Sequence, residues 1–560
     1  MSSKLWAAVA GVVSAAVVLA TAEVVAVFVG AESSPLFAVG SLAIDLAPPG
    51  VKDVMIGLFG TGDKAALLVI LGIVVLALAA AAGLLEQRRP PLGIIVLVVV
   101  SGVAVLAVTT RAGATPFSAI PTVFGMIVGA VVLRLLISRL RTWELDATPA
   151  SPSTSPSRAP APGRAAGEGD EGSGVAGVYG QSPHPLHPQR PRTTPAPQTT
   201  PTTRVDRRRF LTATGIAAVA AVFAGVIARS MNATATAVSA VRDSIALPAA
   251  ATKAEPVPAG AALDVDGITP YVTGNDSFYR IDTALQVPQV NADTWSLKIT
   301  GMVEQEVAIS FSELLALPLE EHLVTLACVS NEVGGDLIGN ALWLGYPIRE
   351  LLARAKPLEG ADMVLSTSVD GFTAGSPLEA LTDPDRVAML AVGMNGEPLP
   401  VEHGFPVRMV VAGLYGYVSA TKWVIQLEVT RFADAQGYWT PRGWSALGPI
   451  KTESRIDVPS AGASVSAGTV PVAGVAWAQH TGIAKVEVRI DDGDWQEARL
   501  AETSGPDTWV QWLYPWEATS GSHTLSVRAT DASGYTQTSD QAPPAPDGAT
   551  GWDAHSVTVN

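Results

Sequence analysis

Cysteine is almost absent from this chain of 560 residues, which contains a single one, Cys328. One thiol cannot form an intramolecular disulfide, so oxidative crosslinks within the chain are excluded. The residue is either a small buried apolar side chain, as most free cysteines are, or a thiolate that acts as a ligand or nucleophile. The surrounding sequence has to distinguish these two possibilities.

Lysine and arginine are fewer than aspartate and glutamate, and histidine is scarce. The formal net charge of −15 argues against a basic face, so we expect no nucleic-acid partner. All the histidines lie outside the long apolar runs described below, which excludes a haem held by two histidines within membrane helices. They are His184, His187, His322, His403, His480, His523 and His555.

Long apolar runs dominate the N-terminal part of the chain. A membrane-spanning helix needs about 20 apolar residues, and a four-helix transmembrane domain is predicted over 1–145. A fifth spanning helix is predicted within 206–230, because residues 211–228 form another apolar run. The first four runs cover 5–30, 65–85, 92–110 and 120–137.

Lysine and arginine clusters at the ends of these runs predict the topology. Lys4 and the clusters at 86–90, 134–141 and 204–209 all face the cytoplasm if the helices alternate from a cytoplasmic N-terminus. We therefore expect a multi-pass plasma-membrane protein in which the chain after about residue 230 is extracytoplasmic. Glu23, inside the first run, either reaches the interface or has a proton or quinone role.

Residues 146–205 are rich in Pro, Ser and Thr, and they contain too few apolar residues to offset the entropy of ordering. This segment is predicted to be a disordered linker. The following DRRRFLTATGIAAVAAVFAG matches the twin-arginine export pattern at Arg207, Arg208, Phe210 and Leu211. The alternative is a simple positively charged anchor. A twin-arginine signal suits an exported enzyme that must receive its cofactor before export.

Residues 260–450 mix strand and helix patterns. The segments 293–303 and 422–430 alternate apolar and polar side chains as strands do. Ser310 and Glu313 have the spacing of a capping box at the start of a helix. An α+β domain is therefore expected here.

Cys328 lies at the end of the apolar strand pattern HLVTLACV, which leads into the glycine-containing turn SNEVGGD. A thiol at a strand end that faces a loop is placed for ligation more than for core packing. A helix pattern over 346–355 then begins at Pro347.

Two stretches of this domain are TLACVSNEVGGDLIGNALWLGYPIRELL (325–352) and MNGEPLPVEHGFPVRMVVAGLYGYVSATKWV (394–424). The first resembles the molybdenum-cysteine segment, and the second the cofactor-phosphate segment, of the sulfite oxidase family of molybdopterin-dependent oxidoreductases. The resemblance covers roughly 270–445 and continues into the C-terminal region. It implies a molybdenum-molybdopterin cofactor, a small-molecule substrate and a thiolate of Cys328 as the metal ligand, which suits a soft metal centre.

The resemblance also implies which residues bind the anionic phosphate of the pterin. His403 and Arg408 are implied donors, with Lys422 and the backbone of Ala420 and Thr421. Arginine suits bidentate contact with a phosphate, and lysine supplies a point charge. His403 could instead be an ordinary turn histidine.

Three further residues are assigned by the resemblance. Asp370 is implied to accept hydrogen bonds from the pterin ring, although an aspartate before a glycine could equally be a turn residue. Tyr279 and Arg280, in DSFYRIDTAL, are implied to lie over the metal. With Cys328 they form the implied catalytic set.

Two departures from the animal and plant sulfite oxidases bear on the substrate. Their cysteine is followed by a pattern like C-A-G-N-R-R, whose arginine helps to hold sulfite, whereas Glu332 stands here and is expected to repel it. The expected R-N-H near the metal reads Arg280-Ile281-Asp282. The direction of reaction therefore stays open between oxidation of sulfite or another oxyanion and reduction of an S-oxide or N-oxide.

A haem-binding segment like that of the animal enzyme is also missing. A separate electron carrier, either a cytochrome or a quinone, is therefore expected.

Residues 455–560 show repeated strand patterns separated by turns, as in IAKVEVRIDDGDWQEARL. They predict an immunoglobulin-like β-sandwich without a cysteine pair. The region resembles the family's dimerisation domain, which allows a homodimer through 455–560. The alternative is a rigid spacer or a cell-surface module.

The sequence thus predicts a multi-domain protein with an α-helical membrane domain, a central α+β molybdopterin domain and an all-β C-terminal sandwich. The predicted function is oxygen-atom transfer by a membrane-anchored, extracytoplasmic molybdenum oxidoreductase. The alternative is a non-enzymatic, membrane-tethered immunoglobulin-like surface protein.

Overall fold

The computed structural model describes residues 3–29, 33–46, 63–110, 117–147, 211–219, 234–284 and 287–560. Two compact units are formed, one from Met1–Val18, Leu76–Val98 and Ile127–Val222, the other from Leu19–Val75, Val99–Met126 and Phe223–Asn560. Residues 148–205 of the predicted linker and the predicted arginine pair at 207–208 lie outside the described residues. The first two linker residues, 146 and 147, belong to the helix that ends at Ala147.

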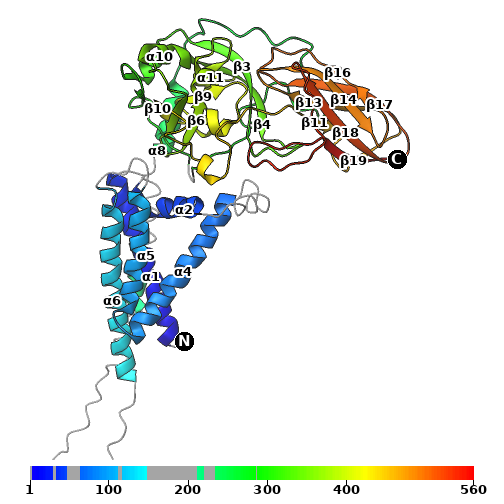
Figure 1. Cartoon of the computed structure of the whole chain (residues 1–560). Helices are drawn as coiled ribbons and strands as arrows, with labels where there is room; N and C mark the ends of the chain where they lie inside the picture. Colours follow the sequence, from blue (N-terminus) through cyan, green and yellow to red (C-terminus); the bar gives the residue numbers. More distant parts are fainter. Residues whose placement is uncertain are drawn as a thin grey trace, which may run out of the picture. The chain divides into compact units, whose positions relative to one another are not determined.

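Within the described residues, four helices are long and apolar enough to span a membrane. They correspond to the first four predicted runs, and they are drawn in blue to cyan in Figure 1. Of the fifth predicted span, only residues 211–219 are described, and these are helical. The four helices are α1 (Ser3–Val29), α4 (Asp63–Arg88), α5 (Leu92–Thr109) and α6 (Ile120–Ala147).

Helices α1 and α4 approach each other at two glycines. A Cβ atom on Gly11 would collide with the backbone carbonyl of Ala79, and one on Gly83 would collide with that of Ala7. Small residues allow such close backbone approach between membrane helices.

A short helix, α2 (Pro35–Asp45), follows α1. Its Ala38 packs against Ala107 and Val108 of α5, and it runs across α5 rather than along it (Figure 1). Just before α2, the Ser34 hydroxyl donates a hydrogen bond of 2.7 Å to the Glu23 carboxylate.

The central region is built on two five-stranded sheets. The first has the order β2-β1-β10-β5-β6, in which β1 and β10 are parallel and the other pairs are antiparallel. Its strands are β1 (Ser296–Gly301), β2 (Val307–Ser310), β5 (Met363–Ser368), β6 (Thr373–Pro377) and β10 (Val424–Thr430).

The second sheet has the order β3-β4-β7-β8, with β9 also paired to β7, and all its pairs are antiparallel. Strand β3 lies at its edge, and Cys328 follows directly after it. The strands are β3 (Glu320–Ala327), β4 (Ile338–Pro347), β7 (Ala388–Met394), β8 (Glu397–Pro398) and β9 (Arg408–Val411).

Short helices precede, connect and follow these strands. The predicted capping box is confirmed, because the Ser310 hydroxyl accepts from the Glu313 backbone while the Glu313 carboxylate accepts from the Ser310 backbone. The helices are α8 (Thr234–Ser244), α9 (Phe311–Leu315), α10 (Ile348–Ala355), α11 (Leu378–Thr382), α12 (Gly416–Ser419), η3 (Val401–His403) and η4 (Thr440–Arg442). Trp343, Phe405 and Trp423 are among the largest side chains of the buried core beneath them.

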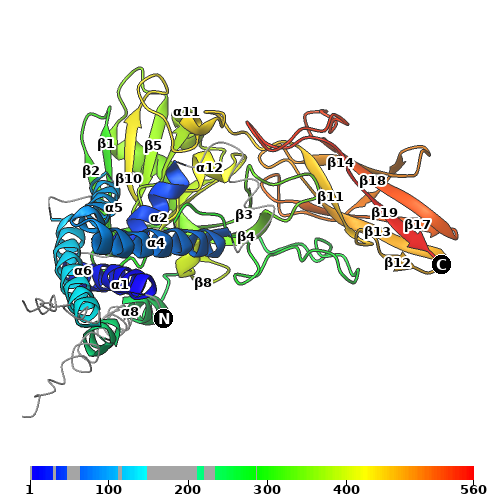
Figure 2. The same cartoon turned by 90° about the horizontal axis from the view of Figure 1, so that it is seen from below.

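The C-terminal region is the predicted β-sandwich. Its two sheets have the orders β11-β13-β17-β16 and β12-β19-β18-β14-β15, and Val472, Val486, Trp512 and Leu525 form part of the core. It extends from one side of the central domain, with the C-terminus at its far end (Figures 1 and 2). The strands are β11 (Glu453–Val458), β12 (Ser464–Val465), β13 (Gly468–Trp477), β14 (Ile483–Ile490), β15 (Gln496–Glu497), β16 (Arg499–Leu500), β17 (Val510–Ala518), β18 (Gly521–Asp531) and β19 (Asp553–Val559).

Candidate active site

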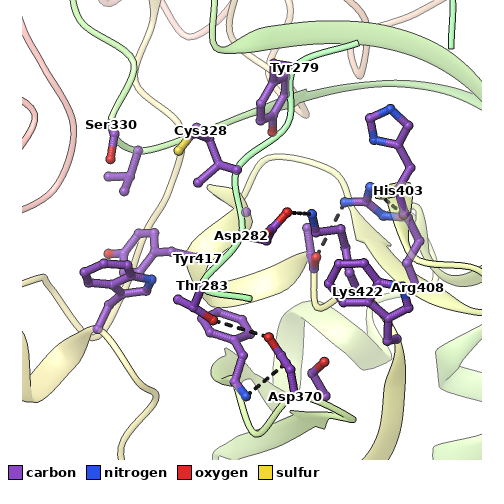
Figure 3. Close-up of a pocket in the computed structure, with 18 of the residues that line it drawn as sticks. Tyr279, Asp282, Thr283, Cys328, Ser330, Asp370, His403, Arg408, Tyr417 and Lys422 are labelled. Atoms are coloured by element: carbon purple, nitrogen blue, oxygen red, sulfur yellow. Dashed lines mark hydrogen bonds and ion pairs between the residues drawn. The ribbon is translucent and has the colours of Figure 1, made fainter. Parts of the chain in front are cut away.

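One pocket of the central domain brings together most of the side chains that the sequence singled out. Its empty space, including the part that is open to solvent, is about 870 Å³. Cys328 lies on one side, beside Ser330, and the basic side chains lie on the other (Figure 3). Of the predicted residues, the lining includes Tyr279, Cys328, Asp370, His403, Arg408, Ala420 and Lys422.

Cys328 is buried, with 8% of its surface exposed. Its backbone N–H donates to the Leu337 carbonyl at 2.9 Å, and its carbonyl accepts from the Asn331 N–H at 3.1 Å. Burial raises the pKa of the thiol, and hydrogen bonds from Ser330 oppose this effect. The thiol alone is therefore protonated at neutral pH, and a bound metal would supply the charge that stabilises the thiolate.

Arg408, the first residue of β9, is a buried cation with 6% exposure. Its guanidinium donates only to backbone carbonyls, those of His403 at 3.2 Å, Met409 at 3.3 Å and Ala420 at 3.5 Å, and it lies 5.1 Å from the Trp343 ring centroid. No carboxylate within the described ranges forms an ion pair with it, and burial lowers its pKa to about 10. A buried charge without a counter-charge is costly, so this position favours an anionic ligand.

Lys422 lies close by and has a carboxylate partner. Its Nζ contacts Asp282 Oδ2 at 3.0 Å and donates to the Glu402 carbonyl at 3.2 Å. Burial lowers the pKa of Lys422 to about 8, although Asp282 opposes the shift. Asp282, 3% exposed, also pairs with Arg280 Nε at 2.9 Å. From the sequence, Asp282 was identified only as a departure from the family pattern, and its ion pairs with Lys422 and Arg280 were not predicted.

His403 is a neutral histidine in this structure. Its Nε2 donates to the Asn275 carbonyl at 3.1 Å, and its pKa is lowered to about 4 by burial and by the charges of Arg408 and Lys422. In the neutral ring Nδ1 then carries no proton. A phosphate bound nearby would raise the pKa again, because an opposite charge favours the protonated form.

Two polar groups of the pocket suit a polar heterocycle. Asp370 accepts from the Phe372 N–H at 3.2 Å and from the Thr283 hydroxyl at 3.5 Å. The Ser368 hydroxyl, also in the lining, is buried and has no hydrogen-bond partner in the part of the chain that is described. A buried orphan hydroxyl beside a carboxylate indicates a ligand with both donors and acceptors.

Three residues discussed from the sequence do not line the pocket. The Arg280 side chain is 41% exposed and is held by Asp282. Thr421 is buried, and its hydroxyl contacts that of Ser366 at 2.7 Å. Glu332 is exposed, so the expectation that it repels an anion at the site is wrong for this structure.

An aromatic wall completes the pocket, and the sequence analysis missed it. Tyr417 and Trp444 have ring centroids 5.9 Å apart, and Trp439 and Trp444 are 6.1 Å apart. All three line the pocket together with Phe372. The only signal in the sequence was the density of aromatic residues in GYWTPRGW.

The domains that this chain shares with known proteins agree with this architecture. The oxidoreductase molybdopterin binding domain matches residues 284–439, and a bacterial Ig domain matches residues 453–527. An uncharacterized oxidoreductase of Bacillus subtilis, YuiH, is 31% identical over 154 residues, which cover 28% of this chain and 74% of the relative. Mitochondrial sulfite oxidase of Rattus norvegicus is 30% identical over 274 residues, 41% of this chain and 49% of the relative. The chain belongs to the sulfite oxidase family of molybdopterin-dependent oxidoreductases.

The family's cofactor, molybdenum-molybdopterin, is therefore the cofactor of this protein, as predicted. The pocket fits it, because Arg408 offers an uncompensated buried charge to the phosphate and Ser368 offers an orphan hydroxyl.

Sulfite oxidase of Arabidopsis thaliana is 28% identical over 305 residues, 44% of this chain and 77% of the relative. The chain spans about half the length of the rat relative. A solved structure of the sulfane dehydrogenase SoxCD from Paracoccus pantotrophus is similar at 23% identity and a TM-score of 0.44, over 49% of this chain and 76% of that one.

Proposed function

We propose that this protein is a membrane-anchored, extracytoplasmic enzyme that transfers an oxygen atom at a molybdenum centre ligated by Cys328. One observation carries the proposal. The only thiol of the chain and a buried arginine that has no carboxylate partner among the described residues line the same pocket. A soft ligand and an anion site in one cavity are what a molybdenum-pterin phosphate needs.

Each side of the pocket has its own role in this proposal. Arg408, Lys422 and His403 hold the phosphate, and Asp370 with Ser368 orients the ring system. The bound cofactor supplies a redox centre that exchanges an oxygen atom and two electrons with the substrate. Tyr279 stays protonated because burial raises its pKa, so its hydroxyl can donate a hydrogen bond to a substrate oxygen.

The reaction that we favour is reduction of a neutral S-oxide or N-oxide. The basic side chains in the described lining are Arg408, Lys422 and His403, and all three are assigned to the phosphate. The side around Cys328 is formed by Val329, Ser330 and the aromatic wall, which offer no charge to an oxyanion such as sulfite. Reduction of a sulfoxide would consume two electrons and two protons and release a sulfide and water.

The electrons would come from a separate carrier, a reduced cytochrome or a quinol. Four apolar helices of spanning length support membrane anchoring. Export by the twin-arginine route, a fifth span within 206–230 and a homodimer through 455–560 remain part of the proposal.

A substrate screen on the full-length protein tests this function. Purified protein is analysed for molybdenum and assayed with methionine sulfoxide and a reduced dye, and separately with sulfite and an oxidant, with Cys328→Ser as the control. We expect molybdenum near one per chain and turnover of the sulfoxide in the wild type, and loss of the turnover in the variant.

Faster turnover of sulfite would overturn the substrate class but not the chemistry. Folded protein that contains no molybdenum would instead support the non-enzymatic surface protein.

A further inference from the structure

The strand that leads into Cys328 is hydrogen-bonded to the C-terminal sandwich. Thr325, in the edge strand β3, donates its backbone N–H to the Asp507 carbonyl at 2.9 Å. Its hydroxyl accepts from the Trp509 N–H at 2.9 Å, and its carbonyl accepts from Gln479 Nε2 at 3.2 Å. The sandwich therefore completes the hydrogen bonds of this edge just before the thiol.

The loop that follows Cys328 is held from the same direction. Cys328 N–H donates to the Leu337 carbonyl, and Leu337 N–H donates to Asn331 Oδ1 at 2.8 Å, so residues 328–337 form one closed turn. Arg455 of β11 donates from Nη1 to the Gly335 carbonyl inside this turn at 2.7 Å. The two flanks of the thiol thus both depend on the sandwich.

Arg455 is itself fixed. Its Nε binds Asp457 Oδ1 at 2.7 Å, and its Nη2 donates to the Thr269 hydroxyl at 2.8 Å. The same turn also packs tightly against Asp553 of β19. Gly334 has a φ of +75°, and a Cβ atom there would lie 2.7 Å from Asp553 Oδ1. The buried guanidinium makes three bonds with its planar fork, which a lysine could not reproduce.

We propose that the C-terminal sandwich is part of the active-site scaffold, and that Arg455 is the positioning residue that holds the Cys328 turn in its ligating conformation. This rests on the proposed function in one respect, that Cys328 ligates the metal. The sandwich would then have a role inside each protomer, whatever its part in dimerisation.

Thiol labelling tests the positioning directly, because Cys328 is the only cysteine of the chain. Full-length protein from cells that cannot make molybdopterin is reacted with 5,5′-dithiobis(2-nitrobenzoate) in detergent. The wild type should react slowly, since the thiol is buried. Arg455→Gln should react about tenfold faster or more, because losing a charge-assisted bond frees the turn. Arg528→Gln, which removes a sandwich arginine paired with Glu487, should react like the wild type.

A second variant keeps the test decisive if Arg455→Gln fails to fold. Thr325→Val preserves shape, removes the acceptor of the Trp509 N–H and should also speed labelling. Unchanged labelling in a folded variant of either kind would overturn the proposal.

A spectroscopic readout on the holoenzyme separates this proposal from the proposed function. The Mo(V) electron paramagnetic resonance signal should shift in Arg455→Gln and also in Arg455→Lys, because a lysine cannot form the three bonds of the guanidinium. An unshifted signal together with fast labelling would refute a positioning role toward the metal. Retention of the wild-type signal in Cys328→Ser would remove the proposed ligand while leaving the labelling result intact.

Discussion

Arg408 keeps a positive charge buried in the pocket, where its hydrogen bonds to described residues all go to backbone carbonyls and the Trp343 ring lies against it. Lys422 differs because Asp282 already compensates its charge. A cofactor phosphate would therefore gain more from Arg408 than from Lys422, which must exchange one anionic partner for another. At the residue scale, Arg408 is the strongest sign of an anionic ligand.

Arg408→Met should lower cofactor occupancy at least tenfold, because a hydrogen bond to a charged group contributes about 1.5–3 kcal/mol. The cofactor-free protein should lose little stability, since the variant also removes the cost of a buried unpaired charge. Molybdenum per chain and the thermal unfolding midpoint measure the two effects. Arg431→Met, which removes an exposed ion pair with Asp434, is the control. Full molybdenum content in Arg408→Met would refute the assignment.

Glu453 is a buried acid outside the pocket, at the start of β11. Its Oε1 has no hydrogen-bond partner among the residues that the structure covers, and burial raises its pKa to about 8 from an ordinary 4.5, with Lys451 opposing. The folded state then holds the proton more tightly than the unfolded state. Its stabilising contribution is complete below pH 4.5 and is lost as the pH rises to about 8, by up to about 1.4 kcal/mol per pH unit.

Glu453→Gln should therefore flatten the pH dependence of stability. Between pH 5 and pH 8 the variant should lose about 1–3 kcal/mol less than the wild type, because the amide cannot ionise. Thermal unfolding of the full-length protein, followed by tryptophan fluorescence, measures the difference. Glu497→Gln, at an exposed position in β15, should follow the wild type. Equal slopes for Glu453→Gln and the wild type would show that Glu453 is ionised in the folded protein.

At the scale of elements, local patterns in the sequence predicted local structure well. The alternation over 293–303 became β1, and the segment 422–430 became β10. In IAKVEVRIDDGDWQEARL, the turn between the two strand patterns lies between β14 and β15, with Asp491 at a positive φ of 53°. These features depend on the periodicity and the turn residues of a few neighbouring positions, so the sequence alone predicts them.

The pairing of strands that are distant in the sequence could not be predicted from such local patterns. Periodicity identifies which face of a strand is buried, but not that β1 pairs in parallel with β10. The ion pair of Asp282 with Lys422 joins residues 140 positions apart. The predicted site residues were taken from the family resemblance, and their convergence on one pocket depends on such distant pairings.

The helix pair α1 and α4 allows a test at this scale. Gly83→Leu should disrupt the pair, because a side chain at this position meets the backbone of Ala7. We expect the thermal aggregation temperature of the full-length protein in detergent to fall by several degrees. Gly72→Leu, in the same helix but with open space around it, should leave the temperature unchanged. Equal behaviour of the two variants would mean that the close approach of α1 and α4 does not stabilise the protein.

At the scale of the whole molecule, the proposed function depends on delivery to the outer face of the membrane. The sequence pattern at Arg207 and Arg208 predicts export of a folded, cofactor-loaded domain. Replacing both arginines by lysine should leave the catalytic domain protected from protease in spheroplasts, whereas the wild-type domain is digested. Arg204→Lys, outside the arginine pair, is the control. Digestion of the double variant would show that a plain membrane anchor is enough.

The central claim is the bond between the Cys328 sulfur and molybdenum, and molybdenum-edge X-ray absorption of purified protein tests it most directly. The account predicts that the wild type has one sulfur scatterer more than Cys328→Ser when both contain the metal. An identical sulfur shell in the two proteins would contradict it.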